Sequence, residues 1–278
     1  MTILLFSLII LVGGYAAGLL GSLTGLGGGV IVIPMLTLIF GVNIHYAIGA
    51  SLISVIATSS GSAAAYVRDG LSNIRIGLFL EIATTVGAIC GAFLSAFVNP
   101  SVIAVIFGVI LIFSALLSVL KKPEDPKEII EDATTKKLRL AGSYQTAAGR
   151  VAYGSKNAVG GFFMMLFAGT MSGLLGLGSG ALKVLAMDNI MRLPFKVSTA
   201  TSNFMIGVTA AASAGIYFQR GYIDPALTFP IVLGVLGGAI TGSRILKTAD
   251  VSALRKVFAV VIVVIASEMI YNGVNGKL

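Results

Sequence analysis

The stretch GSLTGLGGGVIVIPML, Gly21–Leu36, interrupts an apolar run with a cluster of glycines. A second stretch, SGLLGLGSGALKVLAM, repeats this pattern at Ser172–Met187. Gly176 follows Gly25 by 151 residues (176 − 25 = 151), and the same shift aligns further pairs without a gap. The aligned pairs are Gly18 with Gly169, Leu23 with Leu174, Gly27 with Gly178, Gly29 with Gly180, Ser51 with Ser202, Thr58 with Thr209, Ser62 with Ser213, Tyr66 with Tyr217, Gly70 with Gly221, Gly87 with Gly238, Gly91 with Gly242 and Ser101 with Ser252. A register that holds over roughly a hundred residues indicates two copies of one unit.

The composition determines the broad class of the protein. Hydrophobic residues make up 56% of the 278 residues and charged residues 11%, against about 25% charged residues in ordinary soluble domains. The first charged side chain is Arg68, whereas a spanning helix needs only about 20 mostly apolar residues. The sequence therefore predicts an integral membrane protein and excludes a soluble core.

Each copy contains five hydrophobic elements. In the first copy they are Thr2–Leu23, Val30–Phe40, Tyr46–Val67, Ile76–Val98 and Ser101–Leu120. The second element is too short for a normal span and contains Pro34, which lacks an amide donor, so we expect a half-helix or a broken segment there. In the second copy the elements are Ala158–Leu175, Ala181–Met191, Val197–Phe218, Pro225–Leu246 and Val257–Val274.

The chain divides into a first repeat (1–120), a linker (121–157) and a second repeat (158–278). The linker is the most polar part, with two prolines and many charged residues. Its EIIEDATTKKLRL portion, residues 128–140, predicts a short surface helix, while GSYQTAAGR, residues 142–150, is typical of a loop. We expect a solvated connector without a chemical role.

Because each copy has an odd number of elements, the second copy enters the membrane from the opposite side, and the repeats are inverted. The net charge of +8 resides in the connections, so it reports orientation and predicts no nucleic-acid partner. With the linker in the cytoplasm, most basic connections lie inside and both termini lie outside, as the positive-inside rule requires. Four spans per repeat would instead place the basic region Arg244–Lys256 outside. The predicted fold is an all-α membrane protein of two inverted repeats.

The paired glycine clusters are the predicted binding site, because broken segments at equivalent positions of inverted repeats mark transporter substrate sites. The chain can turn at glycine without steric cost. The half-helix that follows presents unpaired amides and the positive end of its dipole, and both favour an anion. Alternatively, the glycines only permit close helix packing, the favoured interpretation for Gly18 and Gly21. The candidate residues of the two loops are Gly25, Gly27, Gly28, Gly29, Gly176, Gly178, Ser179 and Gly180.

Hydroxyl groups form a second pattern. Ser51, Thr58 and Ser62 have spacings of seven and four, which place them on one helix face, and the second copy repeats the pattern. Such a stripe can line a polar path, or its hydroxyls can bond their own helix backbone. From these segments we select Ser51, Ser202 and Asn203 as candidate ligands; the asparagine side chain has two donors and no evident structural role.

Ionisable groups at membrane depth are costly and usually functional. Lys183 lies in the second short element, where the first copy has Val32, and is a candidate anion ligand; its long stem could also reach an interface. Glu81, whose counterpart is Val232, is the candidate proton carrier for coupling, or an interfacial residue. The sequence suggests no metal site and no cofactor.

The motifs GLGGGVIVIPML and GLLGLGSG, each followed by an Ala-, Ser- and Thr-rich helix, resemble the sulfite exporter TauE/SafE family of bacterial and archaeal permeases. The resemblance covers nearly the whole chain except the linker. It implies transport of sulfur-containing anions such as sulfite, sulfoacetate or related organosulfonates, in many members by export. In the second copy Ser179 replaces a glycine and Leu185 stands where a proline is expected, so Ser179 and Lys183 could indicate a different anion.

Two functional classes follow. One is a secondary carrier that uses an ion or proton gradient and rocks one repeat against the other around the glycine loops. The alternative is an anion channel, or a permease for another small solute or ion. A membrane enzyme is disfavoured, because the sequence offers no His or Cys cluster and no carboxylate pair at depth. The expected partners are a small anionic substrate, the lipid bilayer and a second copy in a homodimer.

Overall fold

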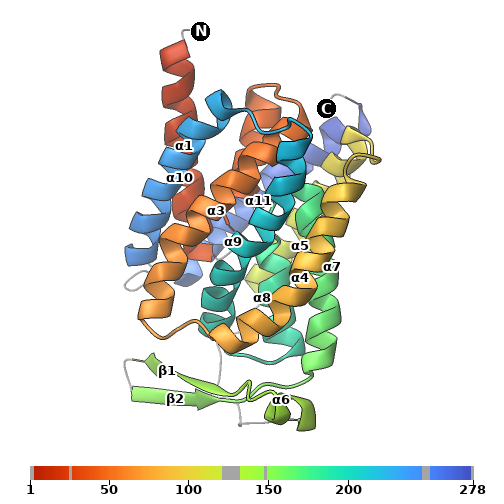
Figure 1. The fold of residues 1–278 in the computed structure, drawn as a ribbon. Helices are drawn as coiled ribbons and strands as arrows, with labels where there is room; N and C mark the ends of the chain where they lie inside the picture. The colour runs from red at the N-terminus through yellow and green to blue at the C-terminus, as the bar shows by residue number, and fades with distance from the viewer. Residues whose placement is uncertain (1–2, 25–26, 121–131, 147–148, 246–250, 277–278) are drawn as a thin grey trace.

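The computed structural model describes residues 3–24, 27–120, 132–146, 149–245 and 251–276. It is mostly helical, and the linker that joins the two repeats in sequence forms a small hairpin at one end of the molecule (Figure 1). The elements are α1 (Ile3–Thr24), α2 (Gly29–Pro34), the π-helix η1 (Met35–Ile39), α3 (Ile44–Arg68), α4 (Ile74–Leu94), α5 (Pro100–Leu120), α6 (Ala133–Lys137), β1 (Gly142–Thr146), β2 (Gly149–Tyr153), α7 (Ala158–Leu175), α8 (Gly180–Leu185), the π-helix η2 (Ala186–Ile190), α9 (Phe195–Gln219), α10 (Pro225–Ile245) and α11 (Val251–Val274).

The element bounds repeat along the chain with the shift of 151 residues found in the sequence. Gly29, which begins α2, corresponds to Gly180, which begins α8, and α3 and α9 correspond at both ends. The packing also repeats: α1 packs on α10, and their counterparts α7 and α4 pack on each other. Two further pairs join counterparts directly, α3 with α9 and α5 with α11, and the pair α3–α10 corresponds to the pair α9–α4. The two copies therefore occupy equivalent positions in the fold.

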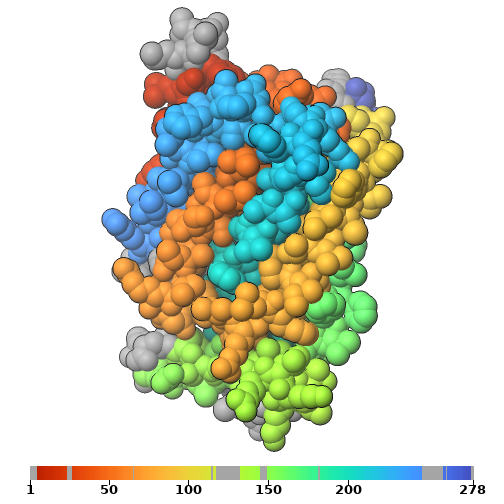
Figure 2. Space-filling model, in the orientation of Figure 1, coloured from red at the N-terminus to blue at the C-terminus, as the bar shows by residue number. Residues whose placement is uncertain are grey.

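Figure 2 shows α3 and α9 running side by side on one face, between α10 and α4. By length and composition, five helices among the described residues can cross a membrane: α1, α3, α4, α7 and α10. The element that follows each glycine loop is shorter, as the sequence predicts. The fold is that of a helical integral membrane protein.

The short elements contain a helix of changed pitch rather than a break. In both copies an α-helical turn continues directly into a π-helix, η1 after Pro34 and η2 after Leu185. Because Leu185 retains its amide and the same π-helix follows, proline alone does not cause this geometry.

The long helices approach closely where they carry glycine. A methyl group at Gly91 would meet the backbone of α7 at Thr170, and one at Gly238 would meet the backbone of α1 at Tyr15. Gly18 lies against the Val235 carbonyl and Gly21 against the backbone of Gly27 and Gly28. This arrangement supports the packing interpretation of Gly18 and Gly21, since small residues let membrane helices pack closely.

The linker differs from the prediction. Residues 142–150 were predicted to form a loop, and this is wrong: β1 and β2 pair as an antiparallel hairpin, with Tyr144 opposite Val151. Along β2, Tyr153 is buried whereas Arg150 and Ala152 are exposed, and this period of two is typical of a strand with one covered face. The fold is therefore mostly helical, consistent with the predicted all-α membrane protein, and the linker adds one two-stranded hairpin. The helix expected at 128–140 is shorter, α6, and residues 128–131 lie outside the described residues.

The linker is also docked onto the helices rather than being only a solvated connector. Asn73, which caps α4, donates from Nδ2 to the Tyr153 hydroxyl (3.0 Å) and to the Leu140 carbonyl (3.3 Å). Tyr153 and Leu140 join a buried cluster with Ile76 and Leu80 of α4. The hairpin and α6 lie at the end of the molecule opposite the start of α1 and the end of α11 (Figure 1).

Candidate transport site

The two glycine loops meet between α3 and α9. A methyl group at Gly29 would lie 3.0 Å from the carbonyl oxygen of Gly176. Gly27 and Gly178 both have left-handed backbones, with φ of 79° and 67°, and both face Val55 of α3 and Ile206 of α9. The sequence placed these glycines at corresponding positions, and the structure brings them to one region; Gly25 lies outside the described residues.

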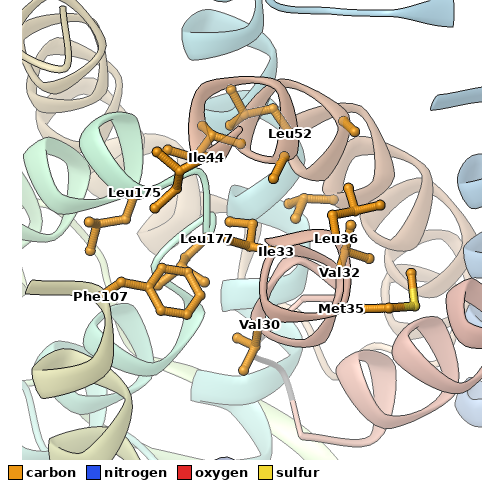
Figure 3. Packing of buried hydrophobic residues seen from close by; sticks show 14 of the residues in the cluster. Val30, Val32, Ile33, Met35, Leu36, Ile44, Leu52, Phe107, Leu175 and Leu177 are labelled. Carbon is orange, nitrogen blue, oxygen red and sulfur yellow. The ribbon is translucent and has the colours of Figure 1, made fainter. Parts of the chain in front are cut away.

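The surroundings of the loops are tightly packed and apolar. Figure 3 shows Val30 and Ile33 of α2 in the same cluster as Leu177 of the second loop and Phe107 of α5. All described residues of both loops are buried. A change of conformation is therefore needed before a solute reaches the loops.

The second loop departs from the first at Ser179. Ser179 has a left-handed backbone, with φ of 48°, whereas its counterpart Gly28 has a right-handed one, with φ of −67°. A serine in this region carries backbone strain that glycine avoids. The position at which the second motif differs in sequence is therefore also the position at which the loop differs in shape.

Ser51 and Ser202 hold the loops in place. The Ser51 hydroxyl donates to the Gly176 carbonyl at 2.7 Å, and the Ser202 hydroxyl donates to the Gly180 carbonyl at 3.3 Å. Thr58 and Ser62 instead donate to carbonyls of their own helix α3. Of the hydroxyl stripe in α3, only Ser51 thus contacts a glycine loop by a hydrogen bond within the described residues.

Asn203 has the structural partners that the sequence did not reveal. Its Nδ2 donates to the Thr199 carbonyl at 3.1 Å, and its Oδ1 accepts from the Ser62 hydroxyl of α3 at 3.4 Å. Its backbone carbonyl also accepts from Ser59. Asn203 therefore joins α9 to α3 one turn before Ile206, at the level of the glycine loops.

Lys183 and Glu81 form a buried ionic group. Lys183 is 0% exposed and Glu81 6%, and Lys183 Nζ lies 4.0 Å from Glu81 Oε2. Thr209 of α9 bridges them: its hydroxyl accepts from Lys183 Nζ and donates to Glu81 Oε1 at 2.6 Å. Thr85 also donates to Oε1, at 3.3 Å. Both charged groups are therefore enclosed by the protein, and neither side chain extends to its surface.

This group is only partly satisfied. An ammonium has three donors, and among the described residues Lys183 Nζ makes one hydrogen bond, to Thr209. Glu81 Oε2 is buried and accepts no hydrogen bond from any residue that the structure describes. Buried charges are normally paired and fully hydrogen-bonded. Lys183 therefore retains the capacity to bind a further oxygen atom.

Thr209 is the site residue that sequence reasoning did not select. It belonged to the hydroxyl stripe as the counterpart of Thr58, and nothing in the sequence separates the two. The sequence signal that could have indicated Thr209 is Lys183, a single lysine in an apolar element, because such a lysine needs a polar partner at the same depth. No group of three or more His, Cys, Asp or Glu side chains that could hold a metal is present within the described residues.

The sequence pattern of the family described as Sulfite exporter TauE/SafE matches residues 10–269. The chain belongs to the TauE/SafE family. The match includes both glycine loops, Glu81, Lys183 and Thr209, and it confirms the resemblance seen in the two glycine motifs.

Relatives with the same overall length agree. The probable membrane transporter protein YunE of Bacillus subtilis is 30% identical over 273 residues, which cover 96% of this chain and 98% of the relative. The probable membrane transporter protein MJ0441 of Methanocaldococcus jannaschii is 26% identical over 270 residues, covering 91% of each chain. No solved structure matches the chain. This TauE/SafE protein is a multi-pass membrane transporter and not an enzyme.

Proposed function

We propose that this TauE/SafE protein is a secondary carrier of small sulfur-containing anions, such as sulfite, sulfoacetate or related organosulfonates, across the cell membrane of a prokaryote. The observation that carries the proposal is Lys183, a fully buried cation one helical turn after Gly180 of the second glycine loop. A buried ammonium with unused donors attracts an anion more strongly than an exposed one, because little water screens it.

The repeated packing supports a carrier that alternates between two states. The packing of α1 on α10 corresponds to the packing of α7 on α4, because α7 is the counterpart of α1 and α4 is the counterpart of α10. We infer that the repeats are inverted and that one rocks against the other around the point where the glycine loops meet. The loops provide the turns, and the first amides of α2 and α8 add donors for the anion oxygens.

The orientation of the protein in the membrane is part of this proposal. The linker lies at the end opposite the start of α1 and the end of α11 (Figure 1). With the linker in the cytoplasm, its basic residues follow the positive-inside rule and both termini lie outside. Labelling of single cysteines introduced at Ser143 and at Asn275 in intact cells tests this; reaction at 143 alone would contradict it.

Transport by proteoliposomes tests the function. Purified protein should take up radiolabelled sulfite with saturation, and Lys183→Met should abolish uptake because the anion loses its cationic partner. Lys196→Met, at an exposed position of α9, is the matched control and should transport normally. Unsaturable sulfite currents without coupling to a gradient would favour the channel. Absence of uptake of sulfite, sulfoacetate and methanesulfonate by the unmodified protein would contradict the proposal.

A further inference from the structure

The two carboxylate oxygens of Glu81 differ in their hydrogen bonds. Oε1 of Glu81 is occupied by Thr209 and Thr85, whereas Oε2, the oxygen 4.0 Å from Lys183, has no hydrogen-bond partner among the described residues. The bridge through Thr209 holds the two charges near each other without closing a direct hydrogen bond. An oxyanion that approaches Lys183 therefore meets unused donors and, beside them, a carboxylate of its own sign.

We propose that Glu81 and the transported anion compete for Lys183, so that one proton is taken up by Glu81 for each monovalent anion that binds. This inference rests on the proposed carrier function and gives its coupling and its substrate charge. Thr209 is a positioning residue that holds both groups.

The charge balance gives the reason. Lys183 and Glu81 together are neutral, and a second negative charge next to them would leave a net charge in a medium of low dielectric constant, which is costly. If a proton from water adds to a Glu81 carboxylate oxygen as the anion binds, lysinium, anion and carboxylic acid again sum to zero. Release of the anion on the other side returns the proton to water, and no covalent bond other than O–H changes.

The same balance limits the substrate. A monovalent oxyanion such as methanesulfonate gives a neutral complex, whereas a divalent anion such as sulfoacetate leaves one uncompensated negative charge. The counterpart positions cannot supply a second cation, because both are valines. Val32 is the counterpart of Lys183, and Val232 is the counterpart of Glu81. The structure therefore predicts an electroneutral carrier that prefers monovalent sulfonates.

The elements packed around Glu81 carry few other ionisable groups within the described residues. Its own helix α4 carries Arg75, exposed at the first turn, and Cys90 on an exposed face. α7 carries no ionisable residue, and α9 has Lys196 at its exposed start and Tyr217 near its other end. The short element of Lys183 also holds the buried Asp188, five residues further along. Lys183 is the one ion-pair partner of Glu81 within the described residues.

The experiment uses proteoliposomes, labelled methanesulfonate and sulfoacetate, and an imposed pH gradient. In a carrier with one proton per anion, an inside-alkaline gradient of one pH unit should drive about tenfold accumulation of methanesulfonate. Valinomycin and potassium, which clamp the membrane potential, should not change it. Sulfoacetate should accumulate much less, or its transport should respond to the potential.

Variants separate coupling from binding. Glu81→Gln keeps the shape of the protonated side chain, so it should exchange methanesulfonate across the membrane but lose the tenfold accumulation. Thr209→Val should move the pH of half-maximal uptake, since the carboxylate loses a hydrogen bond, and Thr209→Ser should restore it. Thr84→Val is the matched control: Thr84 is buried one turn from Glu81, bonds only carbonyls of its own helix among the described residues, and should behave as the unmodified protein.

The inference is overturned if Glu81→Gln still accumulates methanesulfonate in response to the pH gradient, or if clamping the potential abolishes accumulation by the unmodified protein. Either result leaves anion transport, and thus the proposed function, intact. Complete absence of exchange of methanesulfonate, sulfite and sulfoacetate in a well-folded unmodified protein would overturn both. Circular dichroism and size-exclusion chromatography in detergent identify variants that fail to fold.

Discussion

The two halves of the molecule share a scaffold but differ in charge. Where the second half has Lys183 in its short element, the first half has Val32, and where the first half has Glu81, the second has Val232. The third member of the buried group, Thr209, has a threonine counterpart, Thr58, which only bonds its own helix. The framework thus occurs twice, whereas the ion pair, which takes one residue from each half, occurs once within the described residues.

The structural contacts, by contrast, occur twice. Tyr66 of α3 donates to the Ser22 carbonyl at 3.1 Å, and its counterpart Tyr217 donates to the carbonyl of Gly173, the counterpart of Ser22, at 3.3 Å. Both hydrogen bonds join the end of a long helix to the helix that precedes a glycine loop. Comparison of the halves therefore separates residues that maintain the fold, which are duplicated, from the charged group, which is not.

The largest effect is expected when the second half is made to resemble the first. Lys183→Val leaves Glu81 buried without its counter-charge, so it should lower the free energy of unfolding by about 3–5 kcal/mol. The double variant Lys183→Val/Glu81→Val should regain most of this stability, because hydrophobic residues often replace a buried ion pair without loss. Neither variant should transport sulfite. Thermal unfolding in detergent, together with the uptake assay, measures both effects.

Val32→Ala is the control for this comparison, since Val32 holds the equivalent position without a charge. It should lose only the stability expected for a smaller core side chain and should still transport. A single Lys183→Val variant that is as stable as the unmodified protein would show that the ion pair is not part of the folded framework.

A smaller effect should distinguish the two glycine loops. A methyl group at Gly178 would lie 2.6 Å from Ile206, whereas at Gly27 the nearest atom would be 3.6 Å away. Both positions have positive φ, which costs an alanine about 1–2 kcal/mol. Gly178→Ala should cost about 1–3 kcal/mol more because of the overlap. Gly41→Ala, at a positive φ with no atom within 4 Å of the added methyl, measures the backbone cost alone.

The repeat made much of this architecture predictable. Because register, apolar runs and glycine motifs recur with one spacing, the element bounds from the sequence differ from the observed ones by only a few residues at most ends. Lys183 and Glu81 were each identified as isolated charges in apolar helices. Their contact was not predictable, because the two residues come from different copies. The register that relates the copies pairs each of them with a valine, and so does not bring them together.

The hairpin was missed for a different reason. Residues 142–153 contain small and polar residues that are common in loops, and only Tyr144, Thr146, Val151 and Tyr153 favour a strand. Tyr153 is buried because Asn73 and the start of α4 lie beside it, and this neighbour is about eighty residues away in sequence. Local pattern cannot reveal a strand whose covered face is supplied by a distant helix.

The tyrosine hydrogen bonds test whether the halves are equivalent in stability. Tyr66→Phe and Tyr217→Phe each remove one hydroxyl, and each should lower the unfolding free energy by about 0.5–1.5 kcal/mol, the net contribution of a typical hydrogen bond. Because the bonds are counterparts, the two losses should be similar and additive in the double variant. Chemical unfolding in detergent measures them, and a large difference between the two variants would break the equivalence.

The smallest effect is expected in the linker, which has no counterpart in either half. Asp132 accepts from the backbone amides of Thr135 and Asn157, both at 2.7 Å, one with each carboxylate oxygen. The Thr135 amide above all, assisted by Asn157 and Lys156, holds the pKa of Asp132 below its ordinary value. A carboxyl group with a lowered pKa stabilises the folded state above its unfolded pKa, and this contribution disappears as the pH falls through the folded pKa.

Asp132→Asn keeps one acceptor oxygen and replaces the other with a donor. It should therefore preserve protection of the Thr135 amide against hydrogen exchange, lose that of Asn157, and remove the decline of linker stability in acid. Hydrogen exchange measured by mass spectrometry, corrected for the intrinsic rate at each pH, separates the two amides. Uptake of sulfite should be unchanged, because the linker contacts α4 and α7 at their ends while the ion pair lies deeper between α4, α8 and α9. A loss of transport in this variant would show that the linker acts on the buried charges, and the contrast between a duplicated framework and a single charged site would then have to include it.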